Sequence, residues 1–478
     1  MPSSTGDRKG LCRIAKDNNP GLIEQILRSR GYKDIVVLGR ETGNFLRGVI
    51  EEKEKTAEED STLKEDGVSS SPVFQWAQNA FAVDFSVLVG QRGGLNKNLR
   101  FANQLHGVSI GTKEGMLKSV SQWWQKRNVS TDSTETKTEL SKEDFPPWYL
   151  PTFLVSDVLK KKEKELVKIH GQEGAHENKK SSSHWIYKTQ TNNRGKGIEV
   201  FSNFDNLVTF LKDQFSSAKM SHNLKIKPTG IVQQYLQTPL LTTSQRKFDV
   251  RVFLLVARVE PFLAYYACPF EEDAGKKNPG GAAPVVPVAY LKSCACPFDL
   301  TDLETSARHI TNQRVQREYL GAEQYSVEMN DLVQVFDTKF LNTTIPFCTS
   351  KERQHQVQEQ YQKGLQIAME GLAEIIQGQV NPNHLGSFQL FGCDFLFGED
   401  GKVFLLEANR NPALHTNTEA LAQIIPGLVA EAIRIVEAAH STDETTVADD
   451  SRGGVAGCES LMPSKSIPES KIFKRLHI

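Results

Sequence analysis

Two acidic residues near the C-terminal end of the chain, Asp394 and Glu407, lie in apolar runs on either side of the dipeptide Asp400-Gly401. Asp-Gly between apolar runs is a strong hairpin signal. A two-residue turn there would set Asp394 directly opposite Glu407, with Asn409 on the same face. Facing like charges destabilise a sheet, and two carboxylates with an amide oxygen suit Mg²⁺. The pattern predicts a hairpin that binds Mg²⁺ with a nucleotide, and the alternative is an edge hairpin with solvent-facing acids.

A second charged segment alternates with apolar residues. Lys247, Asp249 and Arg251 are spaced two residues apart, which places all three on one face of a strand. The strand continues into the apolar run 252–256, so its middle is expected to be buried. Buried charges must be paired or bound to something. A solvated strand face is the alternative.

A glycine-containing loop is predicted between two further strands. The first strand ends at Lys188, the loop contains Arg194-Gly195-Lys196-Gly197, and the second strand covers residues 198–201. Such a loop can fold over phosphates, whose charge would be met by backbone N–H groups and basic side chains. Taken alone, the residues favour a plain hairpin loop over a phosphate loop.

The whole chain has the composition of a globular protein. Its 478 residues are enough for two or three domains, and 57 Lys and Arg against 58 Asp and Glu give a net charge of −1. No global basic field marks a nucleic-acid binder. Seven scattered cysteines suit a reducing compartment, and no apolar run approaches the roughly 20 residues of a membrane helix. We therefore expect a soluble, cytoplasmic protein without nucleic-acid or membrane partners.

The first part of the chain has the pattern of a short α/β unit. Asn19 followed by Pro20 predicts the start of a helix, and the apolar run 34–38 predicts a buried strand. Another strand is predicted over residues 82–89. Between these strands, the acidic, Lys- and Ser-rich stretch 51–71 predicts a flexible insert.

Helical patterns follow further along the chain. A helix ending in Trp123 and Trp124 is predicted after the stretch from Arg100 to Lys113, and a long one from Gln354 to Ile376, where apolar residues recur every three or four positions. Pro426 predicts the start of a last helix. The region from Trp185 onward begins with short strands and hairpins.

Six motifs, in one order, resemble those of the tubulin-tyrosine ligase family, whose members form amide bonds and have the ATP-grasp fold. The resemblance covers about Arg100 to Val436. The motifs are Trp185–Lys188 with Arg194–Ile198, Gln233–Leu236 with Pro239–Leu241, Arg246–Arg251, His309–Asn312, Ser387–Asp394, and Glu407–Asn409 with Pro412–Leu414. The implied fold class is α/β, of the α+β kind, with antiparallel sheets, flanking helices and a smaller α/β N-terminal domain.

The resemblance also implies a division of the chain. The expected parts are an N-terminal α/β region (1–95), a central domain with polar loops at 126–144 and 159–183 (96–184), an ATP-grasp catalytic domain (185–440) and a disordered tail (441–478).

The family motifs imply roles for individual residues, with ATP and Mg²⁺ as cofactors. The residues expected to bind the nucleotide are Lys113, Lys188, Arg194, Gly195, Gly197, Gln233, Gln234, Tyr235, Leu236, Lys247 and Asp249. Asp394, Glu407 and Asn409 would bind Mg²⁺. The residues expected to act on the reacting groups are Arg251, Lys292, Asn312 and Glu407. At Lys292 the chain departs from the family, which places an Arg there, so a point charge replaces a bidentate donor.

The implied reaction activates a carboxylate as an acyl phosphate, which an amino group then displaces. The expected partners are a free amino acid and the acidic C-terminal tail of tubulin, which implies a cytoplasmic protein of the microtubule cytoskeleton or cilium. Motif spellings at Ser387–Asp394 and Val315–Tyr319 lean towards tyrosine addition over glutamate addition. The alternatives are a ligase with another acceptor, and a nucleotide- and tubulin-binding protein without turnover.

Overall fold

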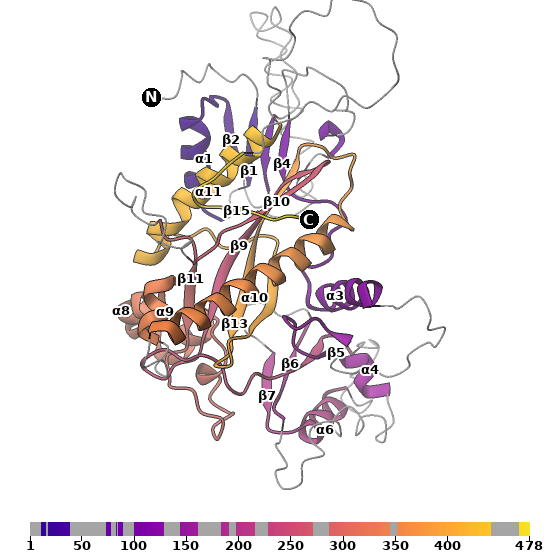
Figure 1. Cartoon of the computed structure of the whole chain (residues 1–478), viewed down its shortest axis with the longest axis vertical. Helices are drawn as coiled ribbons and strands as arrows, with labels where there is room; N and C mark the ends of the chain where they lie inside the picture. The colour runs from indigo at the N-terminus through magenta and orange to yellow at the C-terminus, as the bar shows by residue number, and fades with distance from the viewer. Residues whose placement is uncertain are drawn as a thin grey trace, which may run out of the picture.

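The structure is a computed structural model. It describes residues 11–15, 18–38, 73–77, 83, 85–88, 100–128, 144–160, 183–190, 197–215, 228–270, 286–344, 351–440 and 468–478. Within these residues the chain forms one large and one small sheet with helices packed around them (Figure 1).

The large sheet has 11 strands and contains both ends of the described chain. Its main order is β12-β11-β9-β13-β4-β3-β1-β2, with β10, β14 and β15 attached beside β9, β13 and β10. The strands are β1 (Cys12–Ala15), β2 (Ile35–Leu38), β3 (Phe74–Trp76), β4 (Phe101–Asn103), β9 (Phe248–Val259), β10 (Phe262–Tyr266), β11 (Tyr290–Ser293), β12 (Val333–Val335), β13 (Ser387–Phe397), β14 (Val403–Asn409) and β15 (Lys474–Arg475).

The small sheet has four strands in the order β5-β8-β6-β7, and all its pairings are antiparallel. They are β5 (Thr152–Leu154), β6 (Trp185–Lys188), β7 (Ile198–Phe201) and β8 (Ile231–Gln234). The α-helices are α1 (Pro20–Ser29), α3 (Lys113–Asn128), α4 (Val155–Lys160), α6 (Phe204–Gln214), α7 (Gln313–Leu320), α8 (Ala322–Leu332), α9 (Thr338–Thr344), α10 (Lys351–Gln377) and α11 (Glu419–His440).

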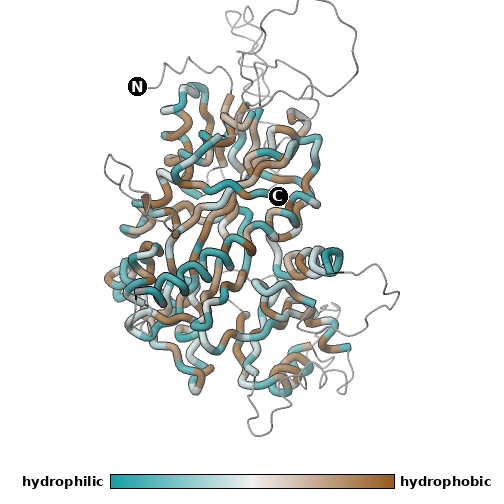
Figure 2. Tube along the Cα trace, viewed as in Figure 1, coloured by the Kyte–Doolittle hydropathy of each residue, from teal (hydrophilic) through white to brown (hydrophobic). Residues whose placement is uncertain are grey.

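Strands β9 and β13 form the centre of the large sheet, and every residue of both is buried. Successive side chains of a strand point to opposite faces. Val252 and Leu254 accordingly pack in one core with residues of α10, whereas Phe253 and Leu255 pack in another with residues of α11. The two long helices therefore cover opposite faces of the sheet. Figure 2 shows apolar residues along the central strands and hydrophilic stretches along α10.

The N-terminal expectations are confirmed in part. Helix α1 begins after Asn19, whose side chain accepts a hydrogen bond from Leu22 N. The strand predicted at 34–38 exists as β2, but it lies at the sheet edge, where Val37 is 40% exposed. The strand predicted over 82–89 is wrong, because Phe85–Leu88 forms a 3₁₀ turn. Its Phe85 packs on the small apolar cluster that contains Leu88, at a three-residue spacing that such a turn brings to one side.

The last helix and the end of the chain also differ from prediction. Helix α11 begins at Glu419 and contains Pro426, because Thr418 caps it by accepting hydrogen bonds from Leu421 N and Ala422 N. The disordered tail predicted from 441 is wrong over 468–478. There β15 pairs with β10, and the side chain of Leu476 is buried. A terminal segment with apolar residues can complete an open sheet edge, which composition alone did not show.

Several predicted segments lie wholly or mostly outside the described residues: the insert 51–71, the polar loops 126–144 and 159–183, and the tail up to 467. The predicted domain boundaries stay predictions, and both sheets cross them. Strand β4 pairs in parallel with β13, so the N-terminal strands extend the sheet of the expected catalytic domain. Strand β5 likewise belongs to the same sheet as β6.

Candidate nucleotide and metal site

A cavity of about 540 Å³ lies between the two sheets and brings most of the predicted site residues together. This volume is in the usual range for a small-molecule site. Of the predicted residues it is lined by Lys113, Lys188, Gln233, Gln234, Tyr235, Leu236, Lys247, Asp249, Arg251, Lys292, Asn312, Asp394, Glu407 and Asn409. Arg194 and Gly195 lie outside the described residues, and Gly197 lines a neighbouring cavity instead.

The predicted hairpin is formed by β13 and β14, but its turn is longer than predicted and one strand contains a bulge. Asp394 lies opposite Glu407, as expected. The predicted two-residue turn is wrong, because Gly398 N donates to Lys402 O and leaves three residues in the turn, with Gly401 at φ 83°. A bulge beside Asp394 then restores the expected pairing. An extra residue at the turn and another in the opposite strand cancel each other.

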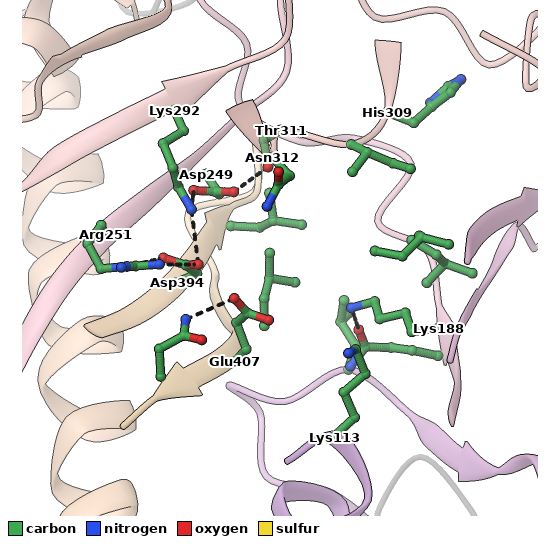
Figure 3. A pocket seen from close by; sticks show the side chains of 18 of the residues that line it. Lys113, Lys188, Asp249, Arg251, Lys292, His309, Thr311, Asn312, Asp394 and Glu407 are labelled. Atoms are coloured by element: carbon green, nitrogen blue, oxygen red, sulfur yellow. Dashed lines mark hydrogen bonds and ion pairs between the residues drawn. The ribbon is translucent and has the colours of Figure 1, made fainter. Parts of the chain in front are cut away.

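Asp394 is buried, at 3% exposed, which excludes the solvent-facing alternative for this residue. Arg251 on β9 binds both of its oxygens, from Nε to Oδ1 at 2.5 Å and from Nη2 to Oδ2 at 2.8 Å. Lys292 on β11 donates to Oδ2 at 3.0 Å. The cations expected near the two acids are thus supplied, on the Asp394 side, by the chain itself (Figure 3).

Lys292 joins two carboxylates, since its Nζ also lies 3.0 Å from Asp249 Oδ1. The hydroxyl of Thr311 donates to the other oxygen of Asp249. Burial alone would raise the pKa of Asp394, but Arg251 and Lys292 outweigh it and hold that pKa well below its usual range. For Asp249 burial dominates and raises the pKa. Burial alone would lower the pKa of Lys292, but the two carboxylates raise it.

Glu407 and Asn409 form the more open part of the acidic end. Glu407 is exposed and accepts a hydrogen bond of 2.9 Å from Asn409 Nδ2. This contact confirms that the two side chains share a face of β14. Both line the cavity, on the strand next to Asp394.

The opposite end of the cavity carries lysines (Figure 3). Lys188 on β6 donates to Gln233 Oε1 at 2.8 Å, and Gln233 in turn donates to Thr152 at 2.9 Å. Burial is the main cause that lowers the pKa of Lys188 to about 8. The charge of Glu407 acts in the opposite direction, and that of Lys113 in the same direction. Its hydrogen-bond partner is a neutral amide.

Lys247 is held by a chain of hydrogen bonds that sequence reasoning missed. Its Nζ donates to Tyr235 Oη at 2.9 Å and to His309 O at 3.0 Å. Tyr235 Oη lies 3.0 Å from His309 Nδ1, and His309 Nε2 lies 2.7 Å from the carbonyl of Asp302. Because only a protonated Nε2 can donate to that carbonyl, Nδ1 accepts from the tyrosine. Burial lowers the pKa of Lys247 to about 8.

The motif His309–Asn312 therefore supplies more than the predicted Asn312. Asn312 caps α7 by accepting from Arg314 N at 3.0 Å, which fixes it at the cavity wall. Thr311 holds Asp249, and His309 holds Tyr235 and Lys247. The motif spelling was the signal available for His309 and Thr311.

These residues fit a magnesium-bound nucleotide. In the described part of the chain no three acidic, histidine or cysteine side chains cluster as a metal site by themselves. Asp394, Glu407 and Asn409 would therefore hold Mg²⁺ together with phosphate oxygens and water, as this ion prefers. Carboxylate oxygens have spare lone pairs for a cation even when hydrogen-bonded. Lys188 and Lys247, whose hydrogen bonds go to amide, hydroxyl and carbonyl oxygens, suit phosphates, and bound ATP would supply a transferable phosphoryl group.

Two sheets around a lysine-lined cavity, with an acidic hairpin at one end, define a protein of the ATP-grasp class, as the sequence predicted. The sequence model of the tubulin-tyrosine ligase family matches residues 119–266 and 288–445. The chain belongs to this family.

Relatives with curated names are similar over about half of the chain. Protein polyglycylase TTLL10 of Macaca fascicularis is 29% identical over 265 residues, which are 52% of this chain and 37% of that protein. Inactive polyglycylase TTLL10 of Homo sapiens is also 29% identical over 265 residues, 53% of this chain and 34% of that one. Tubulin monoglycylase TTLL3 of Danio rerio is 24% identical over 252 residues, which are 53% of this chain and 28% of that protein. The similar region spans about a third of each relative's length.

Among the described helices, none has the length and apolar character needed to cross a bilayer.

Proposed function

We propose that the chain is an ATP- and Mg²⁺-dependent ligase that joins an amino acid to a protein carboxylate through an acyl phosphate. The observation that supports this most is the division of one cavity into a lysine end and an acidic end. Lys188 and Lys247 would bind phosphates, while Arg251 and Lys292 hold Asp394 in position. Fixed charges of this kind stabilise a transferring phosphoryl group without reorganising.

Glycine is our first candidate for the added amino acid. The motif spellings lean towards tyrosine, but the similar proteins reported above are named as glycylases. One of those names, tubulin monoglycylase TTLL3, contains tubulin, which supports the acidic tail of tubulin as the acceptor. A tubulin acceptor would place the protein in the cytoplasm, with the microtubule cytoskeleton or cilium.

The test is ATP-dependent incorporation of labelled glycine, tyrosine or glutamate into tubulin by the wild-type chain and by Glu407→Gln. We expect the wild type to incorporate glycine and Glu407→Gln to fall to background, because the amide keeps the shape but loses the charge that binds Mg²⁺. Glu399→Gln, on the exposed turn of the same hairpin, is the matched control and should stay active. Incorporation of tyrosine instead would support the tyrosine addition that the motif spellings favour.

The second candidate is a nucleotide- and tubulin-binding protein without turnover. It is favoured by Lys292, whose ammonium group is already shared by Asp249 and Asp394, and one relative is named inactive. A wild type that binds ATP but incorporates none of the three amino acids would establish this candidate. Label that enters other proteins of a cell extract but not tubulin would indicate a ligase with another acceptor.

A further inference from the structure

One wall of the cavity is the segment that follows β14. Arg410, Asn411, Pro412 and Ala413 all line the cavity directly after the predicted Mg²⁺ ligand Asn409. The segment belongs to no helix or strand, so other parts of the chain must hold it.

Asn18, from the N-terminal unit, holds this wall with all the polar atoms of its side chain. Its Nδ2 donates to Asn411 Oδ1 at 2.9 Å and to Pro412 O at 2.6 Å. Its Oδ1 accepts from Leu414 N at 2.6 Å. Asn19 adds a hydrogen bond of 3.0 Å from its Nδ2 to Leu414 O. Four hydrogen bonds therefore cross nearly four hundred positions of sequence separation.

The backbone at this point has the conformation that asparagine tolerates best among residues with a side chain. Asn18 and Asn19 have φ values of 67° and 61°, both in the left-handed region. Asn19 is the N-cap of α1, which begins at Pro20. Helix α1 therefore fixes the pair on its C-terminal side.

The wall held by Asn18 also packs against the acidic end of the cavity. A Cβ atom placed on Gly392 of β13 would lie 2.7 Å from Pro412 Cβ and 2.8 Å from Arg251 Nη1. Pro412 and Arg251 therefore both pack against Gly392, and Arg251 holds both oxygens of Asp394. A shift of Pro412 would change the packing of Arg251.

We propose that Asn18 is a positioning residue of the active site, which fixes the wall residues 411–414 and through them the metal end of the cavity. This inference rests on the proposed nucleotide site. It assigns a role to a residue that lies outside the segments matched by the family model. Asn18 touches the wall, not the reacting groups.

The test compares Asn18→Gly, Asn18→Asp and wild type as full-length proteins. Glycine keeps the left-handed backbone accessible and removes only the side-chain hydrogen bonds. Aspartate keeps the acceptor for Leu414 N and loses both donors. Calorimetry measures the affinity for adenylyl imidodiphosphate without Mg²⁺, and then the Mg²⁺ concentration that gives half of the metal-dependent gain.

We expect Asn18→Gly to leave the Mg²⁺-free affinity unchanged and to raise the half-saturating Mg²⁺ concentration by at least about threefold, since each lost hydrogen bond weakens positioning modestly. Asn18→Asp should recover nothing, because its second carboxylate oxygen would face the carbonyl of Pro412, which can only accept. The control is Asn330→Ala, which removes a comparable link between α8 and Glu419 and lines no part of the cavity.

The inference is overturned if Asn18→Gly lowers the thermal midpoint but keeps the wild-type Mg²⁺ dependence, or if Asn330→Ala shifts that dependence equally. A wild type that binds the Mg²⁺-nucleotide yet transfers no amino acid rejects the proposed ligation and leaves the Asn18 comparison decisive. A wild type that binds no nucleotide rejects both.

Discussion

The charged side chains at the two ends of the cavity have partners of different kinds. At the acidic end, Asp394 is bound by Arg251 and Lys292, and Lys292 also binds Asp249, so the charges compensate one another within the large sheet. At the lysine end, Lys188 and Lys247 have hydrogen-bond partners that are amide, hydroxyl or carbonyl groups. Asp394 and Asp249 are thus paired with cations of the chain itself, whereas Lys188 and Lys247 form hydrogen bonds with neutral groups.

The pKa directions express the same difference. Neighbouring opposite charges lower the pKa of Asp394 and raise that of Lys292, so both stay charged near neutral pH. Burial lowers the pKa of Lys188 and of Lys247 to about 8, so their charge is held only weakly. A bound polyphosphate would supply the missing charge at this end. We infer that the acidic end contributes mainly to a fixed geometry and the lysine end mainly to ligand affinity.

Removing a charge from the acidic end should have the largest effect on stability. Asp394→Asn leaves the buried Arg251 without its carboxylate partner and Lys292 with Asp249 alone, and breaking a buried pair in this way costs about 3–5 kcal/mol. We expect a loss of this size in the free energy of unfolding, measured with denaturant. The control is Asp400→Asn, because the exposed Lys402–Asp400 pair at the hairpin turn should contribute about 1 kcal/mol or less. Equal losses in the two variants would contradict the comparison.

Removing a charge from the lysine end should affect binding instead. Lys188→Met is expected to weaken ATP binding by about 10- to 100-fold, the worth of one hydrogen bond to a charged group. The free energy of unfolding should change little, because burial already disfavours this ammonium group. Calorimetric titration and denaturant unfolding measure the two effects on one variant. A Lys188→Met protein that unfolds easily but binds ATP normally would reverse the assignment of the two ends.

The pH dependence of ATP affinity should be the smallest of these effects, but its direction follows clearly from the pKa shifts. Deprotonation of Lys188 and Lys247 near pH 8 removes the charge that binds phosphate, so ATP affinity should fall severalfold between about pH 7 and pH 9. Stability without ligand should move the other way. Both pKa values lie below the unfolded value of about 10.4, so the folded state binds fewer protons and these groups add stability as pH rises from about 8 to 10.4.

Lys188→Arg separates these effects, because its guanidinium stays charged throughout this pH range. The variant should lose a smaller part of its ATP affinity between pH 7 and pH 9 than the wild type does. An identical pH profile for the two proteins would show that Lys188 does not cause the decline.

Much of the site was predictable because its residues obey short-range rules. The period of two placed Lys247, Asp249 and Arg251 on one face, and all three line the cavity. The pairing of Asp394 with Glu407 was also correct, although the predicted turn was not. The longer turn and the bulge cancelled each other there, and the pattern of apolar residues predicts neither of them.

The misses share another cause. Residues 82–89 are apolar enough for a strand, yet Phe85–Leu88 forms a 3₁₀ turn, and Pro426 suits the start of a helix but lies inside α11. In both cases tertiary packing overrides a local preference of modest size. Asn18 had no signal beyond its place before a helix cap, because its partners lie at the other end of the chain.

The sequence by itself determined the chemical types at this site, the order of the family motifs and the faces that carry charge, since these follow from side-chain periodicity and local turns. Only the tertiary structure decided which charges compensate one another. The guanidinium of Arg251 reaches Asp394 across 143 positions, and Lys292 reaches it across 102. Charge compensation and pKa depend on all the groups gathered around a side chain, and strand pairing between distant segments determines which groups those are.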